Sequence, residues 1–426
     1  MIKKIHFMGI GGSGISGVAE LAEKMGFEVS GCDLEEDSSY QVEGVNVLKG
    51  HSKEHLKDID LVVVSPAIFY QSNDNEELLE AKRINKLITW QQFVADYLQK
   101  EKEVICIAGT HGKSTTTAMV TKLLEDADLD PLTVMGAKMS SDGKNYRYGK
   151  GKYFVTEADE FFDNFLNYHP QIIILNNIEY DHPDYFKSEK QLFESYINFI
   201  KNLTGRKILI ANIDDKGVNQ LLSEIDLENI SLIKYSKKED DLDLNLKVLG
   251  DHNLSNALGV VALGKQIGVN NSLIKNSLES FKGIGRRMEL IFDKDNIKVF
   301  DDYAHHPTAI RATLKGLRSK YPENRIWAII EPHGFSRTRE LLSLYKDSFN
   351  EVDKVIIGPI FKARDKEDFG ISPNSIVQIS NHKDVVGLNS FEEIKNIVNS
   401  QVKPNDILII MGAGKSYLWA KNILKI

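Results

Sequence analysis

The sequence predicts an α/β protein of three domains, each built on a mostly parallel sheet with helices on its faces. Short apolar runs alternate with longer amphipathic stretches along the whole chain, which is the pattern of βαβ units. Glycine-rich turns follow two of the strand-like runs, at 9–14 and at 109–112. A length of 426 residues is enough for about three cores.

Composition excludes several classes of protein. The formal net charge of −8 argues against a general nucleic-acid binder, because no broad basic surface is available for phosphates. Two cysteines beside apolar runs do not suggest a disulfide framework. No run of about 18 apolar residues suggests a membrane span, and the start MIKKIHFMGIGG lacks the apolar region of a signal peptide. We therefore expect a cytoplasmic protein.

Three blocks follow one another along the chain. The first, 1–101, begins with the strand-like KKIHFMGI and ends in the helix-like WQQFVADYLQKE. The second, 102–284, begins with EVICIA and ends near SLESFKGIG. The third, 285–426, ends with the strand-like DILIIMGAG and a short helix. Each block is expected to be one domain.

The glycine turn of the first block lies directly after a strand. Gly9, Gly11 and Gly14 have the dinucleotide-binding spacing, and Asp33 ends the next strand. Taken alone, this pattern suggests an NAD-dependent oxidoreductase. The turn itself only requires a diphosphate at a helix N-terminus, which a nucleotide-diphosphate sugar also supplies. The residues expected to bind such a nucleotide diphosphate are Gly9, Gly11, Gly12, Gly14, Asp33 and Ser65.

The second glycine turn, in VICIAGTHGKSTTT, resembles a phosphate-binding loop but has Ile107 at the first glycine position of G-x-x-x-x-G-K-[ST]. The chemistry depends on the GTHGKS core, whose backbone amides would surround the phosphates before a helix. Lys113 would neutralise phosphate charge, and the hydroxyl of Ser114 would bind magnesium. The ATP-binding residues predicted here are Gly109, Thr110, His111, Gly112, Lys113, Ser114 and Thr115.

Four apolar runs of the second block end in polar residues, in VICIAGTHGKS, YFVTEADE, IIILNNIEYDH and KILIANIDD. In an open parallel sheet the ligand lies beyond the carboxyl ends of the strands, so these endings should share one rim. Glu157 and His182 would then join Ser114 as magnesium ligands. A surface acidic cluster and a structural histidine remain alternatives for these two residues.

Eight motifs occur in an order similar to that of the Mur ligase family: GIGGSGISG, AGTHGKSTTT, EADE, NIEYDH, GDHNLSNAL, GIGRRME, DDYAHHPT and EPHGFSRTREL. The resemblance covers nearly the whole chain, from Gly9 to Gly414. The resemblance implies a Rossmann-like first domain for a UDP-sugar, a central P-loop ATPase-type domain, and a Rossmann-like third domain for an amino acid. It further implies that ATP phosphorylates the lactyl carboxylate of UDP-N-acetylmuramate and that L-alanine then forms the amide.

The resemblance also assigns residue roles. Lys113, Glu157, His182 and Arg287 would be catalytic, with Ser114, Glu157 and His182 around the metal. Further ATP contacts would come from His252, Asn253, Asn256, Arg287 and Asp302. His333 and Arg337 would bind the amino acid, since a planar guanidinium suits a carboxylate.

Some positions depart from the family pattern. Lys415 stands where Asp or Asn is usual, Gly334 and Phe335 where a basic residue and a tyrosine are common, and Ala137 where glycine is frequent. The choice among L-alanine, L-serine and glycine therefore stays open. Three alternative functions also remain: a ligase that recycles preformed peptides, an NAD-dependent dehydrogenase, and a non-catalytic nucleotide-binding protein. We expect a monomer or weak dimer without nucleic-acid or membrane partners.

Overall fold

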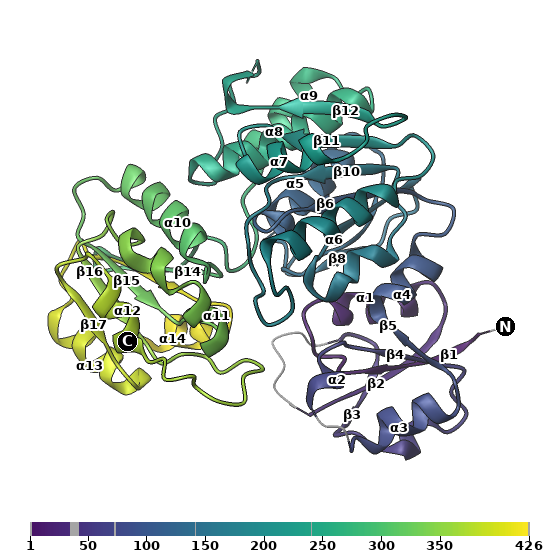
Figure 1. Cartoon of the computed structure of the whole chain (residues 1–426), viewed down its shortest axis with the longest axis horizontal. Helices are drawn as coiled ribbons and strands as arrows, with labels where there is room; N and C mark the ends of the chain where they lie inside the picture. Colours follow the sequence, from purple (N-terminus) through teal and green to yellow (C-terminus); the bar gives the residue numbers. More distant parts are fainter. Residues whose placement is uncertain (1, 35–41, 72–73, 141, 240, 425–426) are drawn as a thin grey trace. The chain divides into compact units, whose positions relative to one another are not determined.

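The computed structural model describes residues 2–34, 42–71, 74–140, 142–239 and 241–424 (Figure 1). Within these ranges the chain contains three β-sheets and forms two compact units. The first unit comprises Met1–Ile178, Phe193–Leu242 and Ala257–Leu278. The second comprises Glu179–Leu192, Asp243–Asn256 and Glu279–Ile426. Among the residues described, no helix is long and apolar enough to cross a membrane.

The N-terminal sheet is entirely parallel, with the order β3-β2-β1-β4-β5. Its strands are β1 (Lys4–Met8), β2 (Glu28–Asp33), β3 (Asn46–Lys49), β4 (Leu61–Val64) and β5 (Leu87–Thr89). Its helices are α1 (Ile15–Lys24), η1 (Lys53–Leu56), α2 (Ile68–Gln71), α3 (Glu76–Arg83), α4 (Trp90–Phe93) and the π-helix η2 (Val94–Leu98). Apolar side chains of β1, β4 and α3 form the core on one face.

The central sheet has the order β12-β11-β10-β6-β9-β7-β8 and is parallel except for β8 at its edge. Its strands are β6 (Glu103–Ala108), β7 (Leu132–Val134), β8 (Tyr146–Arg147), β9 (Tyr153–Ala158), β10 (Ile172–Leu175), β11 (Ile208–Asn212) and β12 (Ser231–Tyr235). The accompanying helices are α5 (Lys113–Asp126), η3 (Phe161–Asn167), α6 (Glu189–Lys201), α7 (Lys216–Glu224), η4 (Lys237–Glu239), α8 (Asp251–Gln266) and α9 (Asn271–Ser280).

The third sheet has the order β13-β14-β18-β15-β16-β17, with only β13 antiparallel to its neighbour in the described chain. Its strands are β13 (Glu289–Lys294), β14 (Ile297–Asp302), β15 (Ile326–Ile330), β16 (Lys354–Ile357), β17 (Val385–Gly387) and β18 (Ile407–Met411). The helices are α10 (Pro307–Lys320), α11 (Phe335–Glu340), η5 (Leu342–Asp347), α12 (Pro373–Ile379), α13 (Phe391–Gln401) and α14 (Ser416–Asn422).

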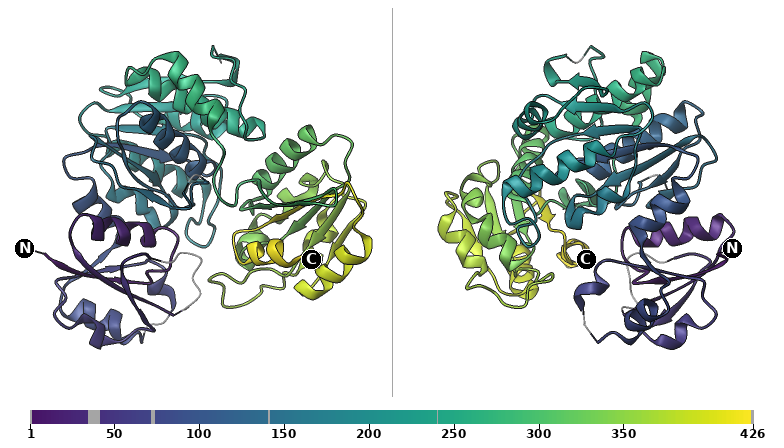
Figure 2. Two further views of the ribbon diagram at one scale, coloured as in Figure 1. Left: turned by 180° about the vertical axis from the view of Figure 1, so that it is seen from behind. Right: turned by 45° about the vertical axis from the view of Figure 1, so that its right-hand side comes forward.

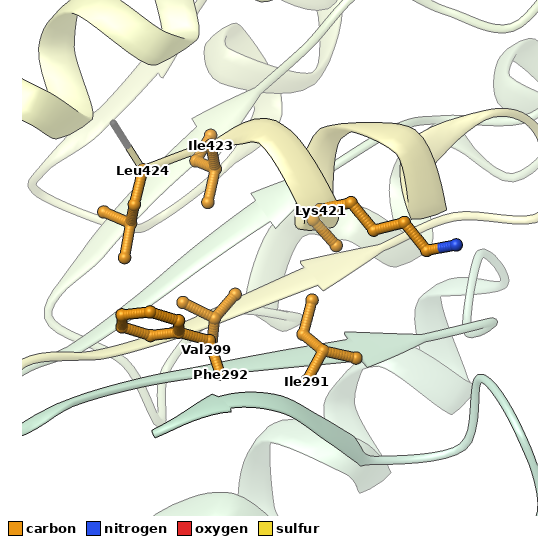
Figure 3. Close-up of a pocket in the computed structure, with 7 residues that line it drawn as sticks. Ile291, Phe292, Val299, Lys421, Ile423 and Leu424 are labelled. Atoms are coloured by element: carbon orange, nitrogen blue, oxygen red, sulfur yellow. The ribbon is translucent and has the colours of Figure 1, made fainter. Parts of the chain in front are cut away.

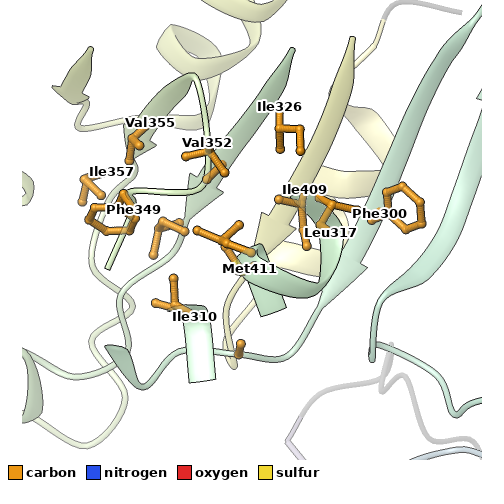
Figure 4. Close-up of a cluster of buried hydrophobic side chains, with 14 of the residues drawn as sticks. Phe300, Ile310, Leu317, Ile326, Phe349, Val352, Val355, Ile357, Ile409 and Met411 are labelled. Atoms are coloured by element: carbon orange, nitrogen blue, oxygen red, sulfur yellow. The ribbon is translucent and has the colours of Figure 1, made fainter. Parts of the chain in front are cut away.

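Helices cover both faces of this third sheet, as Figure 2 shows for the green and yellow part of the chain. On one face, α10 packs on the strands through Ile310 and Leu317, as Figure 4 shows. On the same face, α12 packs through Ile376. On the other, α13 and α14 pack through Val398 and Trp419. Burial on both faces explains why its strands read as continuous apolar runs such as IWAII.

The predicted fold class is confirmed, because all three sheets are mostly parallel and alternate with helices. The four polar strand endings of the second block also share one rim, since β11, β10, β6 and β9 are consecutive parallel neighbours. The antiparallel edge strands β8 and β13 were not predicted.

Candidate functional site

The central glycine turn connects β6 to the N-terminus of α5. Gly112 has φ +83° and Gly109 has φ +137°, both in a region that favours glycine. A Cβ at Gly109 would lie 3.0 Å from the carbonyl oxygen of Asn177, so a side chain there would collide with the next strand ending. The turn thus presents backbone amides at the start of a fourteen-residue helix, which is the arrangement an anionic phosphate requires.

Asn177, just beyond β10, holds the turn in place. The backbone amide of His111 donates to its Oδ1 at 2.8 Å, and its Nδ2 donates to the carbonyl of His111 at 3.1 Å. Neighbouring Asn176 donates to Thr116 Oγ1 at 3.0 Å, and Asn212 at the end of β11 donates to the carbonyl of Asn176 at 2.8 Å. Adjacent strand endings therefore fix the loop before any ligand binds.

Lys113, the first residue of α5, is surrounded by acceptors. Its ammonium lies 2.6 Å from Glu160 Oε2, 2.7 Å from the carbonyl oxygen of Gly109 and 3.7 Å from Asp159 Oδ1. Desolvation acts to lower the pKa of Lys113, but Glu160 and Asp159 outweigh it and raise that pKa. The lysine is therefore a permanent cation at the phosphate loop.

Ser114 and Glu157 lie together at the ends of α5 and β9. The hydroxyl of Ser114 donates to Glu157 Oε2 at 2.9 Å, and the amide of Gly136 donates to Glu157 Oε1 at 2.5 Å. A hydroxyl and a carboxylate in contact beside a phosphate loop are the hard oxygen donors that magnesium prefers. These two residues therefore fit a magnesium ion, and their role as its ligands stays a prediction.

The N-terminal glycine turn, like the central one, is held by the end of a neighbouring strand. The amides of Gly9 and Ile10 donate to the carbonyl of Cys32, and the amide of Gly11 donates to Asp33 Oδ2 at 2.9 Å. Gly9 has φ +73°, and a Cβ there would lie 3.1 Å from that of Ser65. The ends of β1, β2 and β4 therefore bring these predicted UDP-sugar residues together. Of the two other glycines, Gly12 donates to the carbonyl of Gly9, and Gly14 caps α1.

The first two sheets are joined beside this turn. The side-chain amide of Asn145, next to β8, donates to the carbonyl of Ser13 and to Ser16 Oγ, the latter at 3.1 Å. A Cβ at Gly17 would lie 2.9 Å from Asn145 Oδ1, so α1 approaches this residue closely. Asn145 thereby anchors the start of α1 to the central sheet.

In the second unit, Arg337 and Asp181 form a buried ion pair, with Arg337 Nη2 donating to Asp181 Oδ2. Desolvation opposes ionisation of Asp181, but Arg337 and nearby histidines hold its pKa well below the usual range. Desolvation and then Arg337 lower the pKa of His333 to about 4. His333 is therefore neutral at physiological pH, and its ring stacks on Phe361 with 5.3 Å between the centroids.

The two consecutive arginines have different surroundings. Arg286 donates to Asp301 at 3.1 Å, to the carbonyl of Gly412 at 2.7 Å and to Ser416 Oγ at 3.0 Å. Both guanidinium groups lie over the ring of Tyr303, at 5.2 Å from its centroid for Arg286 and 4.9 Å for Arg287. Arg286 therefore joins strands of the third sheet, whereas the role of Arg287 at ATP stays a prediction.

The other residues assigned to ATP in this unit have structural contacts. The buried carboxylate of Asp302 accepts hydrogen bonds from the amides of Met288 and Ala304, both at 2.7 Å. Desolvation raises its pKa. Asn253 donates to the carbonyl of Leu249 at 2.7 Å, and Asn256 donates to Asn253 Oδ1 at 3.4 Å. Both lie with His252 in the first turns of α8.

Comparison with known proteins identifies the family. Three family models match in succession: "Mur ligase family, catalytic domain" over residues 4–101, "Mur ligase middle domain" over 107–244, and "Mur ligase, glutamate ligase domain" over 286–414. A protein of Acetivibrio thermocellus named UDP-N-acetylmuramate–L-alanine ligase is 36% identical, with 99% of this chain and 96% of that protein covered. The chain belongs to the Mur ligase family.

Other relatives agree with this assignment. A Clostridium acetobutylicum protein of the same name is 36% identical over 97% of this chain and 95% of its own. The crystal structure of UDP-N-acetylmuramate-alanine ligase MurC from Thermotoga maritima has a TM-score of 0.81 at 26% identity, covering 99% of this chain and 98% of that one. A murein peptide ligase from Psychrobacter arcticus, also 26% identical, has a TM-score of 0.72 with the same coverage.

For this Mur ligase, the structure groups the predicted site residues in three sets: Gly9 to Asp33 with Ser65, the loop from Gly109 with Glu157, and Arg337 with His333. His182 belongs to the second unit, where its amide donates to Asp181 Oδ1 at 2.7 Å. Its role as a metal ligand stays a prediction. Three residues were not predicted as part of the site, although they lie within the polar strand endings of the second block: Asn177, Glu160 and Asp181.

An apolar pocket on β13 and β14 lies outside these sets. Figure 3 shows Ile291, Phe292, Val299, Ile423 and Leu424 lining it, together with Lys421. Its lining offers one ammonium and no acid, so it lacks the groups that phosphoryl or acyl transfer needs.

Proposed function

We propose that this Mur ligase joins L-alanine to the lactyl carboxylate of UDP-N-acetylmuramate at the expense of ATP, in the synthesis of peptidoglycan precursors. The observation that carries the proposal is the phosphate loop with Lys113, Ser114 and Glu157 in contact around it. It occurs in a chain that matches, over nearly its whole length, relatives named for this reaction.

The reaction has two steps. The terminal phosphoryl group moves from ATP to an oxygen of the lactyl carboxylate, which gives ADP and an acyl phosphate. The amine of L-alanine then attacks the acyl carbon and loses a proton to solvent, and the tetrahedral intermediate expels phosphate to leave an amide. Lys113 and the amides of the loop stabilise the negative charge that develops on the transferred group.

Ser114 and Glu157 are the residues that would hold magnesium in this proposal, with His182 as a further ligand. A bound magnesium ion supplies charge neutralisation at the phosphates. The contribution of the chain is to fix these groups beside one another: the amide of Gly136 holds Glu157, and Glu160 holds Lys113.

The remaining substrates are assigned by charge and position. The N-terminal glycine turn, with Asp33 and Ser65, is proposed for the diphosphate of the UDP-sugar. Arg337, with His333, is proposed for the carboxylate of the amino acid. Arg337 Nε is buried without a hydrogen-bond partner among the residues described, so one donor of this guanidinium is not satisfied by those residues. Further contacts to ATP are proposed for His252, Asn253, Asn256, Arg287 and Asp302. The domain boundaries are proposed to lie after residues 101 and 284.

A second candidate is the recycling reaction, in which a preformed peptide replaces the single amino acid. The similarity to the murein peptide ligase of Psychrobacter arcticus favours it, but the TM-score of 0.72 is below the 0.81 found with the alanine ligase. The dehydrogenase interpretation of the N-terminal glycines is no longer needed, because that segment matches a Mur ligase domain.

Phosphate release from ATP tests the proposal. The purified protein is given UDP-N-acetylmuramate with L-alanine, L-serine, glycine or the tripeptide of the recycling reaction, each over a range of concentrations. We expect kcat/KM to be highest for free L-alanine, with no release when the UDP-sugar is omitted. A higher kcat/KM with the tripeptide would favour the recycling ligase, and release without any UDP-sugar would refute both.

A further inference from the structure

The N-terminal sheet contains a buried group of metal-ligating side chains that has no part in the proposed reaction. His6, Cys32, His55 and Glu77 each offer one ligand atom, and these atoms all lie within 4.8 Å of one another. They come from β1, β2, η1 and α3, four elements separated along the chain. The side chains of His6 and Glu77 are fully buried, and 14% of the His55 side chain is exposed.

Glu77 is at the centre of the group. Its Oε1 lies 2.9 Å from His6 Nε2 and 3.2 Å from His55 Nδ1, and its Oε2 lies 3.2 Å from Cys32 Sγ. Tetrahedral zinc has ligand bonds of about 2.0–2.3 Å, which place neighbouring ligand atoms roughly 3–4 Å apart. The four atoms therefore need only small shifts to surround one ion.

We propose that His6, Cys32, His55 and Glu77 bind one divalent zinc-type cation in the N-terminal domain. The donor set is two imidazoles, one thiolate and one carboxylate, a mixture that suits zinc and not magnesium or calcium. A thiolate and a carboxylate together balance the two positive charges of the ion. The filled site is therefore neutral overall, as burial requires.

Neighbouring groups are placed to orient these ligands. His6 Nδ1 lies 2.9 Å from Ser30 Oγ, a contact that fixes the ring with Nε2 facing Glu77. His51 Nδ1 lies 3.2 Å from Cys32 Sγ and 3.1 Å from Glu77 Oε2, so it donates to ligand atoms from outside the tetrad. Hydrogen bonds of this kind around a first set of ligands are typical of built metal sites.

The site is connected to the glycine turn through β2. The carbonyl of Cys32 accepts the amides of Gly9 and Ile10, and the next residue, Asp33, accepts the amide of Gly11. A metal bound to Cys32 Sγ would fix the end of β2 beneath this turn. The cation is therefore a structural clamp for the turn proposed to hold the UDP-sugar, although metal binding itself does not depend on the ligase reaction.

Cobalt(II) titration tests the proposal. The whole chain is freed of bound metal, kept in excess magnesium and titrated with cobalt(II), while its absorbance spectrum is recorded. We expect one equivalent to give the strong visible bands of tetrahedral cobalt and a near-ultraviolet thiolate-to-cobalt band, both removed by zinc. Excess magnesium competes with cobalt for the oxygen donors of Ser114 and Glu157. Because these two residues have no thiol, cobalt bound to them could not produce the near-ultraviolet thiolate band.

Three variants make the test specific. Cys32→Ser should lose the thiolate band, whereas Cys106→Ser should keep it, because Cys106 is the other buried cysteine and lies on β6 outside the tetrad. His55→Asn changes the most exposed ligand, so folding should survive; it should keep the thiolate band but weaken cobalt binding at least tenfold. The proposal is wrong if wild-type protein gives no thiolate band at one equivalent, or if Cys32→Ser retains it. If Cys32→Ser does not fold, unchanged cobalt affinity in His55→Asn contradicts it instead.

Discussion

The positive charge of Lys113 is paired with carboxylates before any phosphate binds. Its ammonium is paired with Glu160 and Asp159, so ATP must replace or share these carboxylate contacts. The side chain of Glu160 is almost fully buried, and the pairing holds the lysine beside the loop instead of in solvent. A cation fixed in advance stabilises transferred charge without reorganising at the moment of reaction.

Replacing Lys113 by alanine should therefore stop catalysis. We expect at least about a hundredfold loss of turnover, as when one preorganised electrostatic group is removed. The matched control is Lys122→Ala, because Lys122 lies on the same helix and forms an ion pair with the nearby Asp126 at 2.9 Å. That control should keep near-normal turnover. Steady-state phosphate release from both variants decides the matter, and equal rates would remove Lys113 from the site.

Replacing Arg286 and Arg287 by alanine should have different effects on stability and on turnover. Arg286→Ala should destabilise the fold by on the order of 2 kcal/mol, because it leaves buried Asp301 without its charged donor. Arg287→Ala should cost less stability, because buried Asp302 loses the nearby charge of Arg287 but keeps its two amide hydrogen bonds, and it should reduce turnover at saturating ATP. Denaturant unfolding and kinetics of the two variants measure both effects. The reverse pattern would exchange the roles of the two residues.

The Arg337–Asp181 pair predicts a pH dependence. Because the folded pKa of Asp181 lies below the unfolded value of about 4, the pair stabilises the protein above about pH 4. That stabilisation is lost as the pH falls through the folded pKa. Arg337→Ala should cost about 3–5 kcal/mol at neutral pH, since it leaves a buried carboxylate unpaired. The difference from wild type should shrink in acid; a difference independent of pH would mean that the pair does not titrate as inferred.

At the scale of the element, the loops depend on their neighbours in the sheet. Gly109 combines φ +137° with a Cβ position 3.0 Å from the carbonyl oxygen of Asn177. This phosphate-binding loop was predicted from the sequence, because its glycines belong to a recognisable motif. Asn177, Glu160 and Asp181 were not, because which strand endings become neighbours depends on the sheet order and on contacts far apart in sequence.

Gly109→Ala should weaken ATP binding at least tenfold, because the added methyl group displaces the loop from Asn177. Gly268→Ala is the matched control: Gly268 also has a positive φ, +83°, but its Cβ position is open. Both variants should lose about 1–2 kcal/mol of stability from the strained backbone. Only Gly109→Ala should lose ATP affinity in calorimetric titration; an equal loss in both would mean that the contact with Asn177 is unimportant.

At the scale of the whole molecule, the succession of three parallel-type sheets was predictable, since each block repeats the same alternation of apolar runs and helices. Two segments within the central block, Glu179–Leu192 and Asp243–Asn256, nevertheless group with the third sheet. Thr308 Oγ1 donates to Glu179 Oε1 at 2.6 Å, and Lys315 approaches Asp251 at 3.4 Å. Such contacts leave no periodic pattern in the sequence, so they could not be predicted from it.

The proposed reaction is tested most directly by following labelled oxygen from the lactyl carboxylate to the released phosphate. UDP-N-acetylmuramate labelled with oxygen-18 in its lactyl carboxylate is incubated with ATP, L-alanine and the enzyme, and the released phosphate is analysed by mass spectrometry. Ligation through an acyl phosphate predicts that the phosphate carries one labelled oxygen and that the amide product keeps the other. Unlabelled phosphate would show that ATP does not phosphorylate this carboxylate, and would contradict the proposed reaction.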